Sequence, residues 1–333
     1  MPTVPAAATT QRAIVQDRYG DAGVLRLAEV AVPRPGKGEV LLRVHAAGLD
    51  RGTWHLMTGK PYLARAAFGF RRPRNPVPGR DAAGTVVALG EGVTRFAPGD
   101  EVYGVAPGSF AEYAVAREDK LAHKPANLTF EQAAVVPISA GTALQALTDA
   151  GRVEAGQRVL VIGASGGVGS YAVQLATAYG ADVTGVCSAA KADLVRTLGA
   201  VRTIDYASED YADGTEHYDL VLDIAGNPSL SRLRRALTPK GTAVIVGGEE
   251  GGSFSGGMNR QLRALLLSPF VGQRLTMCVS KERAADLERL NPLLEDGRVV
   301  PSLERTYPLA DAAEAMRRLE AGDVRGKVSI SAA

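Results

Sequence analysis

The sequence predicts an α/β protein in which a doubly wound parallel sheet adjoins an irregular antiparallel barrel. Three observations predict this fold class. A short apolar run, Val159–Ile162, stops at a glycine turn and is followed by a helical pattern. Strand and helix patterns alternate from there to residue 279. Residues 12–127, by contrast, hold short strand patterns separated by Pro and Gly turns, which is typical of a barrel.

The composition is that of a globular protein of about two domains. The 333 residues are 46% hydrophobic and 22% charged, and a net charge of +2 indicates no polyanionic partner such as nucleic acid. No apolar run approaches the roughly 20 residues that span a bilayer, so we expect no stable membrane insertion. Cys187 and Cys278 lie in apolar, strand-like runs, which favours a reducing, cytoplasmic location without disulfides. Met1–Thr10 lacks a basic start and an apolar stretch, and we interpret it as a short flexible lead.

The individual elements follow from local patterns. Strands are expected at Val40–Val44, Ala83–Ala88 and Glu101–Tyr103, and the pattern from Glu131 to Ala150 predicts a long helix interrupted near Pro137. The six strands predicted for the parallel sheet are Arg158–Ile162, Val183–Cys187, Thr203–Asp205, Leu220–Ile224, Ala243–Val246 and Arg274–Val279. Further helices are predicted at Ser229–Leu237, Asn259–Leu267 and Leu309–Glu320, and a last strand near Val328–Ile330. The Gly/Ser-rich segment 247–257 is either a lid or a solvated linker.

A dinucleotide site is predicted at Ala164-Ser165-Gly166-Gly167-Val168-Gly169, the glycine fingerprint with alanine in its first position. Gly166 lets the backbone approach a pyrophosphate, and Gly169 allows close packing of helix on strand. The readable strand before the loop and helix after it favour this interpretation over a plain tight turn. The ligand then sits at a helix N-terminus.

The end of the second strand of the sheet predicts which dinucleotide binds. An NAD site places an Asp or Glu there for the ribose 2′-hydroxyl. This chain instead has Ser188 and Lys191, a hydroxyl and an ammonium that suit a 2′-phosphate. Lys191 taken alone is equally compatible with a solvated lysine at a helix start. The missing acid and the Ser/Lys pair together favour NADPH.

Several motifs resemble those of the medium-chain dehydrogenase/reductase superfamily, most closely its zinc-free quinone oxidoreductase branch, which includes the zeta-crystallin-like enzymes. The motifs are, in order, Gly79–Gly90, Pro98–Val102, Ser139–Ala143, the glycine loop and Arg325–Lys327. The resemblance covers nearly the whole chain. It implies a Rossmann dinucleotide-binding domain at residues 128–280 and a discontinuous GroES-like catalytic domain at residues 1–127 and 281–333, with the active site between them.

The resemblance also carries over cofactor-binding positions. They follow the ends of successive strands of the sheet and are Ser165, Gly166, Gly167, Val168, Ser188, Lys191, Tyr206, Asn227, Val246, Gly247, Gly248, Cys278, Val279 and Ser280. Ser165–Val168 match the pyrophosphate loop, Tyr206 lies beside the adenosine, and the last two segments pass the nicotinamide. Strand Arg274–Val279 resembles the strand that pairs across a homodimer in this superfamily.

The chain departs from the zinc-dependent members. They carry His-Glu where this chain has Arg80-Asp81, a catalytic Cys in the region 48–50, and a cysteine-rich zinc lobe that is missing here. A zinc site needs three or four suitably spaced ligands, and the four histidines are scattered. We therefore expect no metal.

Four residues are candidates for the catalytic wall: Asp50, His55, Tyr62 and Thr142. Asp50 stands where the quinone reductases usually have Asn; it either orients a donor or forms a turn or helix cap. His55 faces the nicotinamide pocket or is a partly buried, hydrogen-bonded side chain. Thr142 is placed near the nicotinamide ring by the resemblance, and Tyr62 is a further donor.

The function implied is an NADPH-dependent, zinc-independent reductase acting on a quinone or on the activated C=C bond of an α,β-unsaturated carbonyl compound. A second interpretation is a trans-acting enoyl reductase of a biosynthetic pathway. An interpretation from another class is an NADPH-binding sensor or structural protein with little turnover. The expected partners are a small-molecule substrate and a second copy of the chain.

Overall fold

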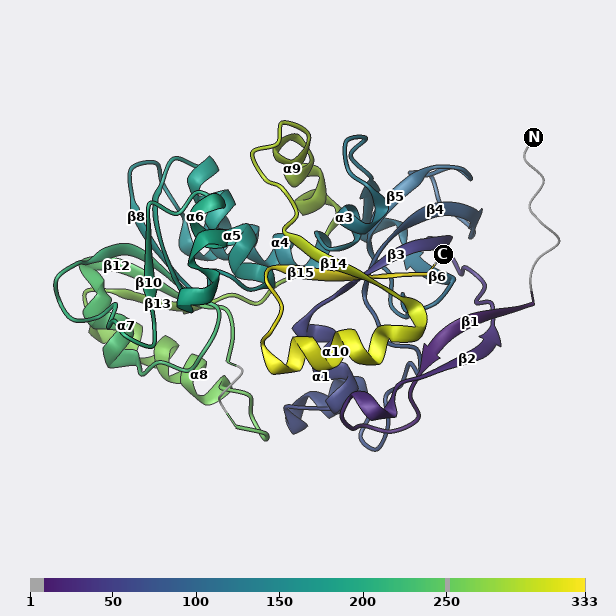
Figure 1. Cartoon of the computed structure of the whole chain (residues 1–333), viewed down its shortest axis with the longest axis horizontal. Helices are drawn as coiled ribbons and strands as arrows, with labels where there is room; N and C mark the ends of the chain where they lie inside the picture. The colour runs from purple at the N-terminus through teal and green to yellow at the C-terminus, as the bar shows by residue number, and fades with distance from the viewer. Residues whose placement is uncertain (1–8, 249–251, 333) are drawn as a thin grey trace.

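The computed structural model describes residues 9–248 and 252–332. It has two lobes side by side, one holding the strands of residues 158–277 and the other holding strands from both ends of the chain (Figure 1). Residues 1–8 of the predicted flexible lead lie outside the described part, and Thr10 already begins a strand. None of the helices in the described ranges has the length and apolar character to cross a membrane.

The barrel lobe is assembled from both ends of the chain. Its strands are β1 (Thr10–Val15), β2 (Arg26–Ala31), β3 (Glu39–Leu49), β4 (Asp81–Leu89), β5 (Glu101–Val105), β6 (Tyr113–Arg117), β7 (Leu121–His123), β14 (Leu303–Pro308) and β15 (Lys327–Ser331). Seven of them form a sheet in the order β14-β15-β3-β4-β5-β7, with β6 paired to β3. β15 runs antiparallel to β3, with Val328 opposite Leu49, so the C-terminal strands complete the predicted irregular barrel.

The second lobe is the predicted doubly wound sheet. Its strands are β8 (Arg158–Ile162), β9 (Asp182–Cys187), β10 (Arg202–Asp205), β11 (Tyr218–Asp223), β12 (Leu237–Ile245) and β13 (Arg274–Met277). They are parallel and run in the order β10-β9-β8-β11-β12-β13. The chain therefore reverses direction across the sheet between β8 and β11, and ligands bind at the carboxyl ends of the strands beside such a reversal.

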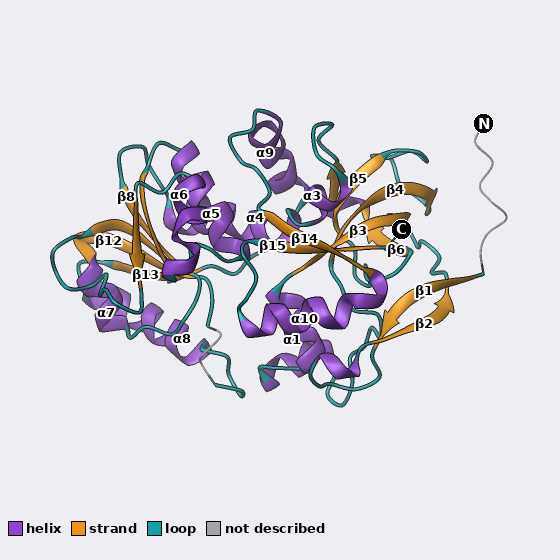
Figure 2. Ribbon diagram, in the orientation of Figure 1, coloured by secondary structure: helices purple, strands orange, loops and turns teal. Residues whose placement is uncertain are grey.

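The β8 sequence explains why that strand is central. Val159 and Val161 belong to the core on one face of the sheet, and Leu160 and Ile162 to the core on the other. Alternate residues of a strand point to opposite faces, so a continuous apolar run is what a strand covered on both sides requires. Figure 2 shows helices on either side of these strands.

The helices differ from the prediction mainly around Pro137. They are α1 (Arg51–Thr58), α2 (Arg65–Phe68), α3 (Phe130–Ala134), α4 (Pro137–Gln145), α5 (Gly167–Ala178), α6 (Ala192–Thr197), α7 (Leu230–Ala236), α8 (Met258–Leu267), α9 (Ala284–Glu295) and α10 (Ala312–Ala321). The predicted long helix is two helices followed by a π-helical turn, Ala146–Gly151. Thr129 and Gln132 form a capping box at the start of α3, and Pro137 begins α4 because a first helical turn needs no proline N–H.

Several strand assignments also differ. β3 ends at Leu49 rather than Val44, and β1, β2, β6 and β7 have no counterpart among the predicted strands. β12 begins at Leu237 rather than Ala243, and β13 ends at Met277 rather than Val279. β14 is missing from the prediction, because its sequence Leu-Glu-Arg-Thr-Tyr-Pro has little apolar alternation and buries Tyr307 alone. The domain limits at 127/128 and 280/281 remain predictions.

Candidate active site

The predicted phosphate loop connects β8 to α5. Gly163 has a φ of +85°, a conformation that favours glycine, and its N–H and that of Ala164 both donate to the Val186 carbonyl at 3.0 Å. A Cβ on Gly169 would lie 2.1 Å from the Gly163 oxygen, so a side chain there would force α5 away from the loop. The sequence folds into this turn because glycine occupies the positions where the backbones meet.

The same loop fits a pyrophosphate. Helix α5 begins at Gly167, and the N–H groups of a first helical turn have no partner within the helix. A Cβ on Gly166 would approach the Gly163 oxygen no closer than 3.5 Å, which leaves open space beside the loop. Gly166, Gly167 and Val168 line a cleft of about 450 Å³ between the lobes. The residues present therefore fit a dinucleotide.

The cleft brings together residues from most of the predicted segments. The predicted residues that line it are Asp50, His55, Thr142, Gly166, Gly167, Val168, Lys191, Val246, Gly247 and Gly248. Those that do not line it are Tyr62, Ser165, Ser188, Tyr206, Asn227, Cys278, Val279 and Ser280. The two groups are in contact where Thr142 Oγ1 donates to Ser280 Oγ at 3.0 Å.

Lys191 lies at the end of the cleft where we predict the 2′-phosphate. Its ammonium is not simply solvated: Nζ donates to the Gly322 carbonyl at 2.7 Å and to the Val324 carbonyl at 2.9 Å. Burial lowers its pKa. Lys191 therefore connects the sheet lobe to the segment after α10, and its third N–H is the donor left for a ligand. Tyr206 and Asn227 are exposed beyond the strand ends.

Asp223 holds the start of the glycine segment after β12 in place. The Asp223 carbonyl accepts the N–H groups of Val246 at 2.8 Å and Gly247 at 3.2 Å. Its carboxylate is buried and pairs with Arg260 of α8, whose Nη2 also donates to the Gly247 carbonyl at 3.2 Å. Burial raises the pKa of Asp223 to about 7, against the effect of the Arg260 cation. The sequence patterns contain no indication of this pair.

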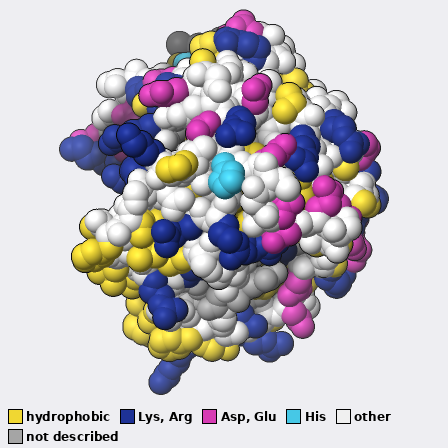
Figure 3. Space-filling view, turned by 90° about the vertical axis from the view of Figure 1, so that its left-hand side faces the viewer, with side chains coloured by type: hydrophobic (Ala, Val, Ile, Leu, Met, Phe, Trp, Pro, Cys, Tyr) yellow, Lys and Arg dark blue, Asp and Glu magenta, His cyan; other side chains and the backbone are white. Residues whose placement is uncertain are grey.

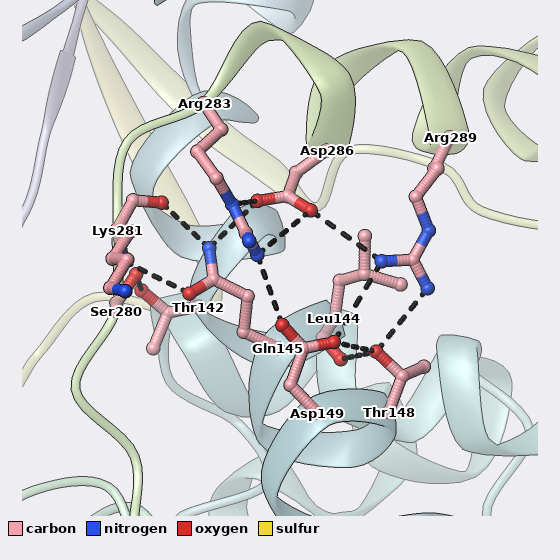
Figure 4. Close-up of polar contacts among 10 residues, drawn as sticks. All are labelled: Thr142, Leu144, Gln145, Thr148, Asp149, Ser280, Lys281, Arg283, Asp286 and Arg289. Atoms are coloured by element: carbon pink, nitrogen blue, oxygen red, sulfur yellow. Dashed lines mark hydrogen bonds and ion pairs between the residues drawn. The ribbon is translucent and has the colours of Figure 1, made fainter.

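The segment after β13 crosses back to the barrel lobe through a polar network (Figure 4). Thr142 Oγ1 donates to Ser280 Oγ at 3.0 Å, and Gln145 Nε2 donates to the Lys281 carbonyl at 2.6 Å and to Asp286 Oδ2 at 2.9 Å. Burial raises the pKa of the Cys278 thiol to about 11, so this cysteine is neutral. Because the hydroxyl hydrogen of Thr142 is donated to Ser280, Oγ1 of Thr142 can only accept hydrogen bonds from groups in the cleft.

Asp50 and His55 are held in place by helix α1. Asp50 is its N-cap, and Oδ1 accepts the Thr53 N–H at 2.7 Å. Its second oxygen, Oδ2, is buried and has no hydrogen-bond partner among the described residues. His55 Nδ1 lies 2.7 Å from the Lys60 carbonyl. A carbonyl accepts only, so Nδ1 carries the hydrogen and Nε2 is the nitrogen left for a ligand.

The glycine-rich segment reaches the barrel lobe beside Tyr62. The Tyr62 N–H donates to the Ser253 carbonyl at 2.9 Å, and the Leu63 N–H donates to the Phe254 carbonyl at 3.2 Å. The Tyr62 side chain is 44% exposed and lies against the Arg65 guanidinium. Residues 249–251 of the predicted lid lie outside the described part. The described residues 252–257 thus bridge the two lobes, and lid motion remains a prediction.

Lys327 belongs to a family motif, but the sequence predicts no role at the site for it. The side chain is 2% exposed, and its ammonium donates to the Leu49 carbonyl at 2.9 Å and to Ser139 Oγ at 3.0 Å. It lines the cleft next to Gly167. A lysine at the start of an apolar C-terminal strand is the signal that points to it. Among the described residues, no group of three or more His, Cys, Asp and Glu side chains is placed to hold a metal ion.

Comparisons with known proteins agree with this architecture. Residues 36–126 match the alcohol dehydrogenase GroES-like domain, and residues 198–330 match the zinc-binding dehydrogenase model. The chain is 31% identical to the mitochondrial NAD(P)H oxidoreductase RTN4IP1 of Mus musculus, covering 99% of this chain and 91% of the relative. It is 34% identical to the 2-methylene-furan-3-one reductase of Solanum lycopersicum, covering 94% and 76%.

A solved structure of a named oxidoreductase has the same fold as this chain. The quinone oxidoreductase from Coxiella burnetii superimposes with a TM-score of 0.85 at 28% identity, covering 97% of this chain and 99% of that one. These relatives confirm an oxidoreductase that uses a nicotinamide cofactor. The chain belongs to the medium-chain dehydrogenase/reductase family, in its quinone oxidoreductase branch.

Proposed function

We propose that this chain is an NADPH-dependent, zinc-independent reductase of a quinone or of the activated C=C bond of an α,β-unsaturated carbonyl compound. The observation that carries the proposal is the shared cleft: the phosphate loop and the Asp50/His55 wall line one space of about 450 Å³. This volume lies within the range of roughly 300–1,000 Å³ of small-molecule sites. The Solanum lycopersicum relative is named a 2-methylene-furan-3-one reductase, which supports the enone class. The Coxiella burnetii structure is named a quinone oxidoreductase, which supports the quinone class.

NADPH rather than NADH is proposed because of the groups at the end of β9. Ser188 and Lys191 follow that strand, and no acid stands there to accept from a ribose 2′-hydroxyl. The third N–H of Lys191 is the cationic donor for a 2′-phosphate. When bound, the nicotinamide supplies the hydride, and the protein positions it and shields the pocket.

The side chains of the cleft then have distinct tasks. Thr142 presents acceptor lone pairs, which suits an amide N–H. His55, fixed through Nδ1, presents Nε2; in its protonated form this nitrogen donates to an oxygen on which negative charge develops. Tyr62 does not line the cleft and is 44% exposed, so we propose it as a hydrogen-bond donor at the rim of the cleft.

Zinc independence is proposed although residues 198–330 match a zinc-binding dehydrogenase model. The support is the chemistry of the side chains present. Arg80 is a cation committed to Glu282, and His55 is bonded to a carbonyl. His45 lies 3.1 Å from Thr85 Oγ1 and is stacked on Phe130. Arg80 and His45 are therefore not presented as ligands. His55 presents Nε2, but it belongs to no group of three or more His, Cys, Asp and Glu side chains among the described residues, whereas a zinc site needs three or four ligands.

The test is NADPH oxidation with a panel of quinones, enones and carrier-bound enoyl substrates, together with a measurement of NADPH affinity. We expect turnover with at least one of the two substrate classes. Turnover confined to carrier-bound enoyl substrates would instead identify a biosynthetic enoyl reductase. Tight NADPH binding with no turnover across the panel would identify a sensor or structural protein and overturn the proposal.

We also propose a homodimer formed through β13. This strand is at the edge of the six-stranded sheet, and an apolar edge strand calls for a covering partner. Leu266 and Phe270 beside it are 72% and 85% exposed. Figure 3, which views this end of the molecule, shows hydrophobic side chains gathered along its lower margin. In light scattering, Phe270→Asp should yield monomer, whereas Val201→Asp, a control at a residue 72% exposed, should not.

A cytoplasmic location is proposed from the two cysteines, both free and neither paired. The RTN4IP1 relative is named mitochondrial, so its name does not support this location. Fractionation of cells expressing the full chain tests this point. Recovery of the protein with an organelle would contradict it.

A further inference from the structure

One edge of the molecule carries basic side chains that the overall net charge conceals. Residues 51–80, which contain α1 and α2, hold seven Lys and Arg and no Asp or Glu. Residues 252–281, which contain α8, again hold no Asp or Glu. Figure 1 shows α1 and α8 along the same lower edge of the molecule. A net charge of +2 for the whole chain therefore coexists with a basic region beside α1.

The acids next to these two segments in the chain do not cancel this charge. They are Asp50, Asp81, Glu249, Glu250 and Glu282. Asp50 and Asp81 are buried, and Glu282 is paired with Arg80. Residues 249–250 lie outside the described part. The remaining cations of residues 51–80 are thus not compensated by the acids that adjoin them in sequence.

The elements that pack beside this region leave it basic as well. The Tyr19 hydroxyl donates to the Gly69 carbonyl at 2.6 Å, which brings residues 16–21 against it. That segment and residues 51–80 together hold eight Lys and Arg and two Asp. Helix α10, which contacts α1, holds two basic and two acidic side chains and adds no net charge.

A closed turn keeps Phe70 exposed within this region. The Arg74 N–H donates to the Phe68 carbonyl at 2.8 Å and closes the turn. Gly69 has a φ of +120°, and a Cβ there would lie 2.1 Å from the Arg72 oxygen, so this turn requires glycine. Phe68 and Phe70 are 37% and 74% exposed. The exposure of Phe70 is therefore a property of the folded turn.

The exposed apolar side chains continue to the mouth of the cleft. Pro61 and Gly256 line the cleft from its two lobes, and a Cβ on Gly256 would lie 2.7 Å from Pro61 Cγ. Tyr62 and Leu63, which follow Pro61, are 44% and 45% exposed, and Phe254 is 66% exposed. Large exposed apolar patches mark sites that bind a protein or a membrane.

We propose that this edge binds the surface of an anionic lipid bilayer. Arg71, Arg72 and Arg74, here called the turn arginines, are exposed and contact the lipid headgroups. Phe70 enters the boundary between headgroups and acyl chains, where aromatic side chains are favoured. Basic side chains near such a surface are attracted to it. A soluble acidic partner uses the same arginines but gives no reason for an exposed Phe among them.

This contact is a reversible surface contact and not a membrane span. The residues proposed for the dimer interface, Leu266 and Phe270, are not part of it. The inference goes beyond the proposed reductase function and does not depend on it. Apolar quinones and enones partition into bilayers, so the docked protein presents the mouth of its cleft to the phase in which such substrates accumulate.

Sedimentation with vesicles tests the charge of the surface. The wild type should bind vesicles of phosphatidylserine and phosphatidylcholine in equal amounts, bind pure phosphatidylcholine far less, and dissociate as salt rises. Each basic residue near an anionic surface strengthens binding about fivefold, so replacing the three turn arginines with Gln should weaken it about a hundredfold. The matched control is Arg117→Gln, Arg196→Gln and Arg298→Gln, three exposed residues outside both segments. Equal affinities of the two triple variants, or no binding by the wild type, overturn the proposal.

The apolar part of the surface is tested separately. Phe70→Ser should weaken vesicle binding about tenfold, because a largely exposed Phe loses its burial in the bilayer. Val201→Ser, at a residue 72% exposed, is the control and should change little. If heparin binds through the turn arginines while Phe70→Ser leaves vesicle binding unchanged, the surface takes a soluble polyanion and the proposal is overturned. Vesicle binding without reductase turnover refutes the proposed function and not this surface, and turnover without vesicle binding does the reverse.

Discussion

Replacing Arg260 with methionine removes the cation that faces the buried Asp223 carboxylate. Asp223 is 1% exposed, and Arg260 Nη1 contacts its Oδ2 and donates to the Pro228 carbonyl at 3.1 Å. Removing one partner of a buried ion pair costs about 3–5 kcal/mol of stability. We expect a loss of this order for Arg260→Met at pH 8. Cofactor affinity should fall as well, because Arg260 also holds the Gly247 carbonyl.

The loss of stability in Arg260→Met should depend on pH. Burial raises the pKa of Asp223 from 3.8 to about 7, so the folded state binds more protons than the unfolded state in that interval. The contribution of Asp223 to stability is thus greatest at low pH and falls as the pH rises to about 7. Without Arg260 the folded pKa rises further, so the variant goes on losing about 1.4 kcal/mol per pH unit above neutrality.

Urea unfolding at pH 6 and pH 8, followed by circular dichroism, measures both effects. Arg263→Met is the matched control, since Arg263 lies on the same helix and is exposed. The reasoning predicts a larger loss for Arg260→Met at pH 8 than at pH 6, and little change for the control at either pH. Equal losses at the two pH values, or a loss no greater than that of the control, would refute it.

Three further changes test the cofactor site and the metal. Lys191→Met should weaken NADPH binding by about 1.5–3 kcal/mol, the strength of a hydrogen bond to a charged group, and NADH binding less; equal losses by calorimetry would mean that Lys191 only joins the lobes. Gly169→Ala places a Cβ 2.1 Å from the Gly163 oxygen, so we expect a loss of about 1–3 kcal/mol in thermal unfolding and of NADPH binding; normal affinity would contradict the loop geometry. Treatment with a chelator should leave activity unchanged, and a fall in activity with zinc release would contradict zinc independence.

The parts of the fold that could be predicted rest on local signals. Glycine at 163, 166 and 169 and the apolar run before it are close together in the chain, so strand, turn and helix are readable together. The order of the family motifs then places the barrel and the cleft. β14 shows the limit: its strand forms because β15 pairs with it, not because its own residues alternate.

The parts that could not be predicted depend on contacts between distant residues. The sequence predicts Lys191 as a phosphate ligand, but the carbonyls of Gly322 and Val324 that it binds come from the other end of the chain. Lys327 likewise acquires its role from β3 and α4. Asp223 and Arg260 meet only because α8 packs beside the sheet. A sequence pattern does not contain such pairings.

The central claim is that the cleft directs hydride from the nicotinamide to a carbon–carbon double bond or a quinone. The most direct measurement is the product formed with NADPH carrying deuterium at the transferable position, analysed by NMR. For an enone, deuterium should appear on the carbon β to the carbonyl of a saturated ketone. Deuterium on the carbinol carbon of an unsaturated alcohol, or no transfer to any enone or quinone while NADPH binds tightly, would contradict the account.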